Sequence, residues 1–295
     1  MSYADRIREE LIALPAKRPC CRRALAYGLL TGVCAEEGQA LSFPTEALAT
    51  FAAQALQRQF GKKNTVEKAT VNRHVSYGFS VCAQAQKAIA DLRAQQWEAD
   101  TDVEQVLSLS CEGCRSAFLR GAFLVGATVN DPRKSFHLEF VTPSVSEGIL
   151  TAFLSFAGYE PRRMERAKGV GLYYKSSTAV EELVTLMGAA RSAMEIINIR
   201  IEREIRNQEN RATNCVAKNI EKSVSAASRQ MAAIEKLTLS GMLAQLPEGI
   251  RHTALLRAEN PDATLEELRM LHEPPITKSG LNHRLQKILD AADKI

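Results

Sequence analysis

The chain has 295 residues, of which 45% are hydrophobic and 24% charged, with a formal net charge of +4. These values are ordinary for a globular protein, and the mild positive charge permits a polyanionic partner without requiring one. No apolar run is long enough to span a bilayer, and the N-terminus opens an amphipathic helix unlike a signal peptide. We therefore expect a cytoplasmic protein with no membrane partner, built from one domain of about 190 residues and a smaller one.

A segment near the middle of the chain repeats one near its start. Residues 114–127 resemble residues 21–34 at an offset of 93 positions. The matching pairs are Cys21 with Cys114, Arg22 with Arg115, Ala24 with Ala117, and Gly28 with Gly121. Both segments read as small-residue helices that are apolar on nearly every side. Interior glycines weaken a helix unless something packs closely on them, so the repeat predicts two structural copies whose helices pack face to face.

The first domain, residues 1–190, is expected to hold these copies at about 20–96 and 113–190. In each copy the glycine-bearing helix is followed by strands and further helices, which gives an α+β fold with an antiparallel sheet. The predicted strands are 40–43, 64–71, 75–82, 136–141, 161–167 and 171–175, with a turn at Lys168 and Gly169. The predicted helices after the glycine-bearing ones are 45–60, 83–95, 145–157 and 178–187.

Residues 191–236 contain no glycine or proline and carry dense charge, which predicts a helical linker. Its narrow apolar stripe runs through Ile220, Val224, Ala227, Met231 and Ile234. Two interpretations stay open: a solvated helix, or a basic surface along a phosphate backbone that includes Arg203, Arg206 and Arg211.

Residues 237–295 predict a small all-α domain with a helix-turn-helix. Pro247 starts one helix, Thr264 and Glu267 form a capping box on a second, short helix, and Thr277 caps a final, longer one. No acid occurs between Pro275 and Leu289. A helix that reads DNA needs this segregation, because a carboxylate would repel phosphate. The candidate DNA-binding residues are Thr277, Lys278, Ser279, Asn282, His283, Arg284 and Lys287.

A second candidate DNA surface is the hairpin that begins near Pro161. It carries the cations Arg162, Arg163, Arg166 and Lys168. A solvated basic hairpin is the alternative.

Several stretches of the chain closely resemble the bacterial WhiA family of sporulation and cell-division transcription regulators. They are residues 114–124, 129–132, 137–143, 210–219 and 274–285, in that order. The resemblance implies a two-copy domain like the LAGLIDADG homing endonucleases, a linker, and a C-terminal helix-turn-helix like the promoter-reading region 4 of sigma factors.

The resemblance also raises the question of nuclease chemistry. LAGLIDADG nucleases end each central helix in an acid that holds Mg²⁺, and here the corresponding positions are Gly126 and Val33. Glu36, Glu37 and Asp131 lie nearby, but octahedral Mg²⁺ tolerates little misplacement of its ligands. We therefore expect an inactive scaffold and no enzyme activity.

The cysteines allow three interpretations. Cys20 and Cys21 precede one central helix, and Cys111 and Cys114 precede the other, so packing of the helices would bring four thiols together. We expect reduced thiols with no metal or cofactor, because adjacent cysteines chelate one metal poorly and no histidine lies nearby. A zinc site and a redox disulfide are the alternatives.

Two functions remain open at this point. The first is a sequence-specific transcription regulator that binds double-stranded promoter DNA through the final helix and contacts a partner regulator or RNA polymerase. The second is a nucleoid-associated or adaptor protein that acts mainly through protein contacts. An active homing-type endonuclease ranks third.

Overall fold

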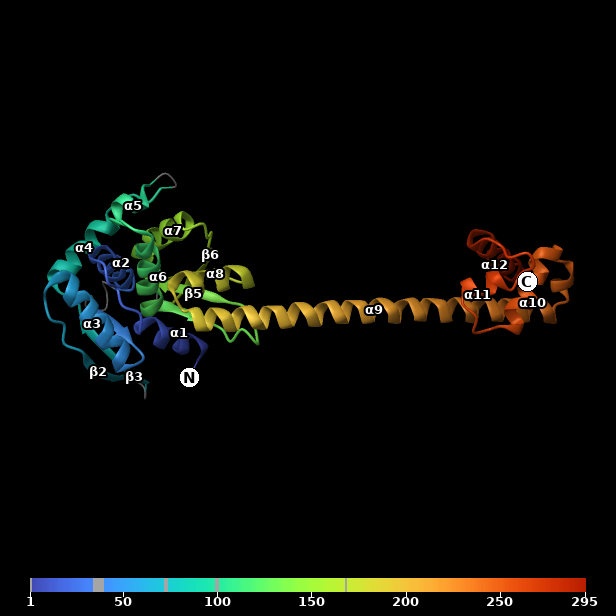
Figure 1. Cartoon of the computed structure of the whole chain (residues 1–295), viewed down its shortest axis with the longest axis horizontal. Helices are drawn as coiled ribbons and strands as arrows, with labels where there is room; N and C mark the ends of the chain where they lie inside the picture. Colours follow the sequence, from blue (N-terminus) through green and yellow to red (C-terminus); the bar gives the residue numbers. More distant parts are fainter. Residues whose placement is uncertain (1, 34–39, 72–73, 99–100, 168) are drawn as a thin grey trace. The chain divides into compact units, whose positions relative to one another are not determined.

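The computed structural model describes residues 2–33, 40–71, 74–98, 101–167 and 169–295 (Figure 1). They form two compact units, Met1–Arg203 and Glu204–Ile295. The division falls inside α9, Ala190–Leu239, a helix of 50 residues. Each unit has its own hydrophobic core.

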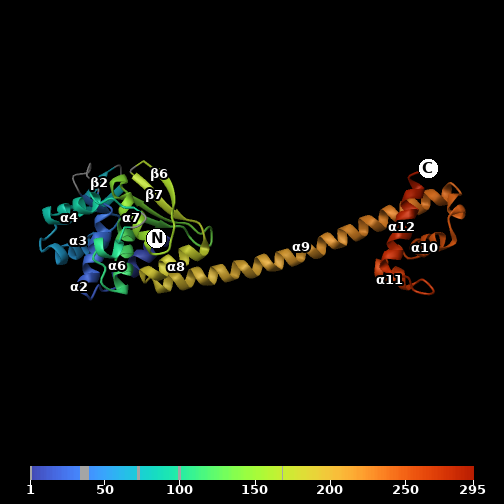
Figure 2. The ribbon, with the colours of Figure 1, turned by 90° about the horizontal axis from the view of Figure 1, so that it is seen from above.

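The first unit is built on two central helices, α2 (Pro19–Leu30) and α6 (Glu112–Gly126), which lie side by side (Figures 1 and 2). A Cβ added at Gly28 would lie 2.0 Å from the Phe118 carbonyl oxygen, and one at Gly121 would lie 2.3 Å from the Leu25 carbonyl oxygen. Each glycine thus lets the opposite backbone approach closely. The prediction that the repeated helices pack through their glycines is confirmed.

The first copy adds a three-stranded antiparallel sheet in the order β1-β3-β2. Its strands are β1 (Ala40–Phe43), β2 (Glu67–Val71) and β3 (His74–Ser80). In the register, Leu41 pairs with Phe79 and Lys68 with Tyr77. Helix α3 (Glu46–Phe60) is capped by the Thr45 hydroxyl and ends at Gly61 in the left-handed region, and α4 (Ala83–Arg93) follows the sheet.

The second copy adds a four-stranded antiparallel sheet in the order β4-β5-β7-β6. Its strands are β4 (Ala127–Val129), β5 (Leu138–Thr142), β6 (Arg162–Arg166) and β7 (Gly169–Tyr174). Helices α7 (Glu147–Phe156) and α8 (Ser177–Met187) complete it, with the short α5 (Val103–Val106) before α6. Strand β4 was not predicted, because three residues are too few to show an alternation of apolar and polar side chains.

Helix α1 (Tyr3–Ile12) forms hydrogen bonds with the first turn of α9 within the first unit. The Tyr3 hydroxyl donates to the Ser192 carbonyl oxygen at 2.8 Å. The Glu10 carboxylate accepts from the backbone N–H groups of Arg191 and Ser192, at 2.7 and 3.2 Å. Because these are free N–H groups of the first turn of α9, Glu10 acts as a cap contributed by another helix.

The second unit gathers the end of α9 with three short helices: α10 (Glu248–Glu259), α11 (Leu265–Met270) and α12 (Lys278–Ala292). Ala233, Ile234 and Leu237 of α9 are buried against Ala254, Leu268, Leu281, Leu285 and Ile288. None of the helices among the described residues is long and apolar enough to cross a membrane.

Two predictions about elements need correction. The strand expected at 64–71 begins only at Glu67, and the helix expected from Val145 begins as a 3-10 turn, Ser144–Ser146. The apolar stripe of the linker is buried only where the second unit packs on it. Ile220 and Val224 are each 59% exposed, whereas Ile234 is buried. The sequence could not show this difference, because helical periodicity does not reveal how far the packing helices extend along α9.

The close contact between α2 and α6 yields a stability prediction. Gly28→Ala and Gly121→Ala should each destabilise the first unit by about 1–3 kcal/mol, since the new methyl group meets backbone that cannot move aside. The measurement is urea unfolding. Gly148→Ala is the control: this exposed glycine of α7 faces only the half-buried Trp97 ring, at 3.2 Å, so little stability should be lost. An equal loss in all three variants would contradict the explanation.

Candidate DNA-binding interface

The helix-turn-helix is held by caps and by one buried cation. Thr264 and Glu267 form the predicted capping box, and the Thr277 hydroxyl accepts from the Gly280 N–H at 3.1 Å. Arg257 is buried and donates to the Ala263 carbonyl oxygen at 2.6 Å, which fixes the turn between α10 and α11. These local interactions set the angle at which α12 is presented.

Helix α12 turns its polar side outward. The helical spacing of Leu281, Leu285, Ile288 and Leu289 predicts a buried stripe. The first three are buried, and Leu289 is half-buried. Among the candidate DNA-binding residues, those with exposed side chains are Thr277, Lys278, Ser279, Asn282, His283 and Lys287. Lys278 and Lys287 form no ion pair within the described part of the chain. The first three turns of α12 therefore present exposed cations and amide groups, and Lys278 interacts electrostatically with Glu266 of α11.

Arg284 is the exception on this helix. Its guanidinium is half-buried and donates to the Gly249 carbonyl oxygen of α10 at 3.2 Å. A side chain in this position packs α12 on α10. Arg284 is one of the DNA-binding residues predicted from the sequence, and periodicity alone could not show this contact with α10.

The basic hairpin is largely neutralised. Arg163 forms ion pairs with Glu147 and Glu165, at 2.5 and 2.6 Å, and Arg166 pairs with Glu139 at 2.6 Å. The Arg166 guanidinium keeps the pKa of the nearly buried Glu139 below its usual range. Of the predicted cations here, Arg162 is exposed, and Lys168 lies outside the described residues. Arg163 and Arg166 therefore already have acidic partners: Glu165 in the same hairpin, and Glu147 and Glu139 from farther along the chain. Whether this hairpin contacts DNA stays a prediction.

The cations of α9 differ from one another. The Arg203 guanidinium lies 4.9 Å from the centre of the Phe136 ring and donates to the Arg133 carbonyl oxygen at 2.6 Å. Arg206 and Arg211 are exposed. In the described structure, Arg206 and Arg211 could contact a phosphate without breaking an intramolecular contact, whereas Arg203 could not.

Among the described residues, no cluster of carboxylates that could hold a metal lies at the C-terminal ends of the central helices. A Cβ at Gly126 would lie 2.1 Å from the Val141 carbonyl oxygen, so no side chain fits there. Val33 is fully buried, and its carbonyl oxygen accepts from the Arg93 guanidinium at 2.5 Å. Asp131 accepts from the Arg133 N–H in the turn between β4 and β5. Glu36 and Glu37 lie outside the described residues.

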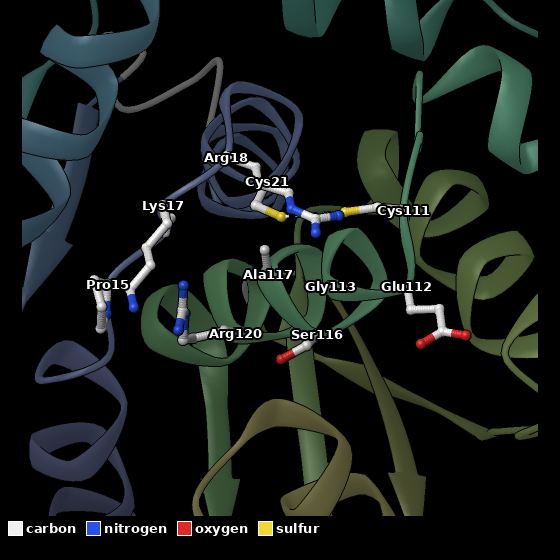
Figure 3. Close-up of a pocket in the computed structure, with 11 residues that line it drawn as sticks. Pro15, Lys17, Arg18, Cys21, Cys111, Glu112, Gly113, Ser116, Ala117 and Arg120 are labelled. Atoms are coloured by element: carbon white, nitrogen blue, oxygen red, sulfur yellow. Dashed lines mark hydrogen bonds between the residues drawn. The ribbon is translucent and has the colours of Figure 1, made fainter.

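The opposite ends of these helices hold the one group of potential metal ligands found among the described residues. The sulfur atoms of Cys20, Cys21, Cys111 and Cys114 all lie within 4.8 Å of one another. Hydrogen bonds from the neighbouring thiols lower the pKa of Cys111 to about 6, while burial raises the pKa of Cys21 to about 12. Figure 3 shows Cys21 and Cys111 on a pocket of about 640 Å³ that Arg18 and Arg120 also line.

Fold and exposed helix together define a class of protein: a LAGLIDADG-like domain joined to a helix-turn-helix. Comparisons with known proteins agree. A family model described as the WhiA LAGLIDADG-like domain matches residues 115–206, and one described as the WhiA C-terminal HTH domain matches residues 210–292.

Relatives extend the match to the whole chain. "Probable cell division protein WhiA" of Carboxydothermus hydrogenoformans is 31% identical, over 100% of this chain and 98% of that protein. The protein of the same name from Alkaliphilus metalliredigens is 42% identical over 183 residues, which cover 61% of this chain and 57% of that protein. The chain thus spans little more than half the length of the Alkaliphilus protein, but nearly the full length of the Carboxydothermus protein. The chain belongs to the WhiA family.

A solved structure supports the fold. Full-length DUF199/WhiA from Thermotoga maritima has a TM-score of 0.56 and 21% identity, with coverage of 100% of this chain and 98% of that one.

A buried histidine predicts that the stability of the helix-turn-helix depends on pH. His272 is buried, with Nδ1 3.0 Å from the Leu268 carbonyl oxygen and Nε2 2.9 Å from the Thr253 hydroxyl. Burial lowers its pKa, and the nearby Arg284 and His252 act in the same direction. Above about pH 6.5 both the folded and unfolded states are neutral at this residue; below it, the unfolded state binds a proton more readily.

We therefore expect the second unit to lose stability as the pH falls from 7.5 to 5.5. The slope from this residue is at most about 1.4 kcal/mol per pH unit. Thermal unfolding at both pH values should show a smaller difference in His272→Gln than in wild type. The exposed His283→Gln variant is the control and should behave as wild type. An unchanged difference in His272→Gln would contradict the assignment.

Proposed function

We propose that this protein is a DNA-binding transcription regulator of sporulation or cell division that recognises specific double-stranded sequences through α12. The supporting observation is the exposed face of α12, where Lys278, Asn282 and Lys287 project without ion pairs in the described structure. Amides and cations are the groups that read base edges in the major groove and bind phosphates. Its place in the cell would be the nucleoid.

The LAGLIDADG-like domain is proposed to be a catalytically inactive scaffold. The blocked Gly126 position and the buried Val33 support this, since the described residues at these helix ends include no pair of carboxylates that could share a metal. A second function, an adaptor acting through protein contacts such as those with RNA polymerase or another regulator, is favoured by the hairpin, whose paired Arg163 and Arg166 offer little to phosphate.

The protein should not cut DNA. Supercoiled plasmid incubated with Mg²⁺ or Mn²⁺ should stay intact on gels at protein excess, because no described carboxylates converge on one metal there. Metal-dependent nicking that disappears in Asp131→Ala would show instead that a displaced acid supports catalysis.

Substitutions on α12 should separate base contacts from phosphate contacts. Asn282→Ala should weaken binding to a genomic target by about 1–3 kcal/mol and binding to scrambled DNA much less. Lys287→Ala should weaken both alike and lower the salt slope by about one unit. Paired titrations at matched salt measure both effects.

Asn207→Ala is the matched control, since Asn207 is also an exposed asparagine on a helix. It should bind both DNAs as wild type does. If wild-type protein showed no preference between target and scrambled DNA, the adaptor function would be favoured; if Asn282→Ala kept full preference, α12 would not be the reading helix.

A further inference from the structure

The four clustered cysteines come from the N-terminal ends of the two central helices. Cys20 and Cys21 lie in the first turn of α2, Cys111 is the N-cap of α6, and Cys114 lies in its first turn. The Cys111 sulfur is 3.6 Å from that of Cys20, 3.5 Å from that of Cys21 and 3.6 Å from that of Cys114. We propose that these four thiolates bind one Zn²⁺ ion and thereby tie α2 to α6.

The distances suit this ion. Zinc–thiolate bonds of about 2.3 Å in a tetrahedron place neighbouring sulfurs about 3.8 Å apart. The three measured separations are slightly shorter, and all six fall within 4.8 Å. Only small side-chain adjustments are needed to close the tetrahedron.

The sequence argued against a metal because adjacent cysteines chelate poorly. In the structure, however, the sulfur atoms of both Cys20 and Cys21 lie close to that of Cys111, at 3.6 and 3.5 Å, so the two adjacent cysteines can face one metal ion. Cys21 and Cys114 are buried, and Cys20 and Cys111 are half-buried. Four protein ligands leave no open coordination position, which is the arrangement of a structural zinc site.

The surroundings compensate the charge of such a site. Four thiolates around Zn²⁺ carry a net charge of −2, and the positive ends of α2 and α6 both point at them. Arg120, only 5% exposed, lines the same pocket, and its Nε has no hydrogen-bond partner (Figure 3). No described carboxylate forms an ion pair with Arg120. A buried, unpaired cation is costly unless an anion lies nearby, and the zinc tetrathiolate is that anion.

Other chemistry fits the cluster less well. A disulfide needs one pair of sulfurs about 2.0 Å apart, whereas Cys111 has three neighbours at nearly equal distance and no pair is singled out. An iron–sulfur cluster distributes its cysteine ligands over several irons and so requires wider spacing than 4.8 Å.

Elemental analysis of the full chain tests the site. Protein purified with reductant and without chelator should contain about one zinc per chain. Cys21→Ser and Cys114→Ser should lose most of it. Cys82→Ser is the control, because Cys82 is buried in the same unit but lies outside the cluster, and it should retain the metal.

A spectroscopic measurement keeps the test independent of how the variants fold. Co²⁺ added to metal-free wild-type protein should give the intense visible bands of a tetrahedral thiolate complex, and Zn²⁺ should abolish them. Protein that binds neither metal in stoichiometric amount after incubation with reductant would overturn the proposal. So would a disulfide among these cysteines, found by mass spectrometry, that persists when reductant and Zn²⁺ are both supplied.

Discussion

The first unit depends on the close approach of α2 and α6. With glycine at positions 28 and 121, backbone meets backbone, and a single methyl group would lie about 2 Å from a carbonyl oxygen. Each of the two helices belongs to one copy of the repeated unit, and each copy also contains an antiparallel sheet. On another side of α6, the Phe118 ring stacks on the Phe153 ring of α7, with the ring centres 4.2 Å apart.

The same packing determines both ends of the helix pair. At the C-terminal ends, Gly126 lies against the Val141 backbone and the Val33 carbonyl oxygen accepts from Arg93. At the N-terminal ends, four sulfurs converge beside the buried Arg120. Among the described residues, potential metal ligands therefore cluster only at the N-terminal ends of the helix pair, where they are cysteine sulfurs. The C-terminal ends of α2 and α6 support the proposal of an inactive scaffold. The N-terminal ends support the proposal of a metal site that ties the two helices together.

In the second unit, the residues that stabilise the fold differ from those proposed to contact DNA. Buried Arg257 and His272 organise the turns, and Arg284 fastens α12 to α10. Lys278, Asn282 and Lys287 take no part in this framework and stay exposed. A helix whose polar face is not used by its own domain is available to DNA at little cost in stability. This division of labour suits a regulator in the WhiA family.

Sequence alone determined much of this protein. The glycine repeat predicted the paired helices. One capping box, an N-cap threonine and the prolines predicted the helix-turn-helix, and the 3.6-residue period predicted which side of α12 is buried. Each of these signals is local or strictly periodic. Only tertiary structure decided which cations remain free. Arg163 and Arg166 meet Glu147 and Glu139, which are distant along the chain, and Arg284 meets Gly249. The cysteine cluster likewise needed the helix register, since a shift of one turn, about 5.4 Å, would separate its sulfurs.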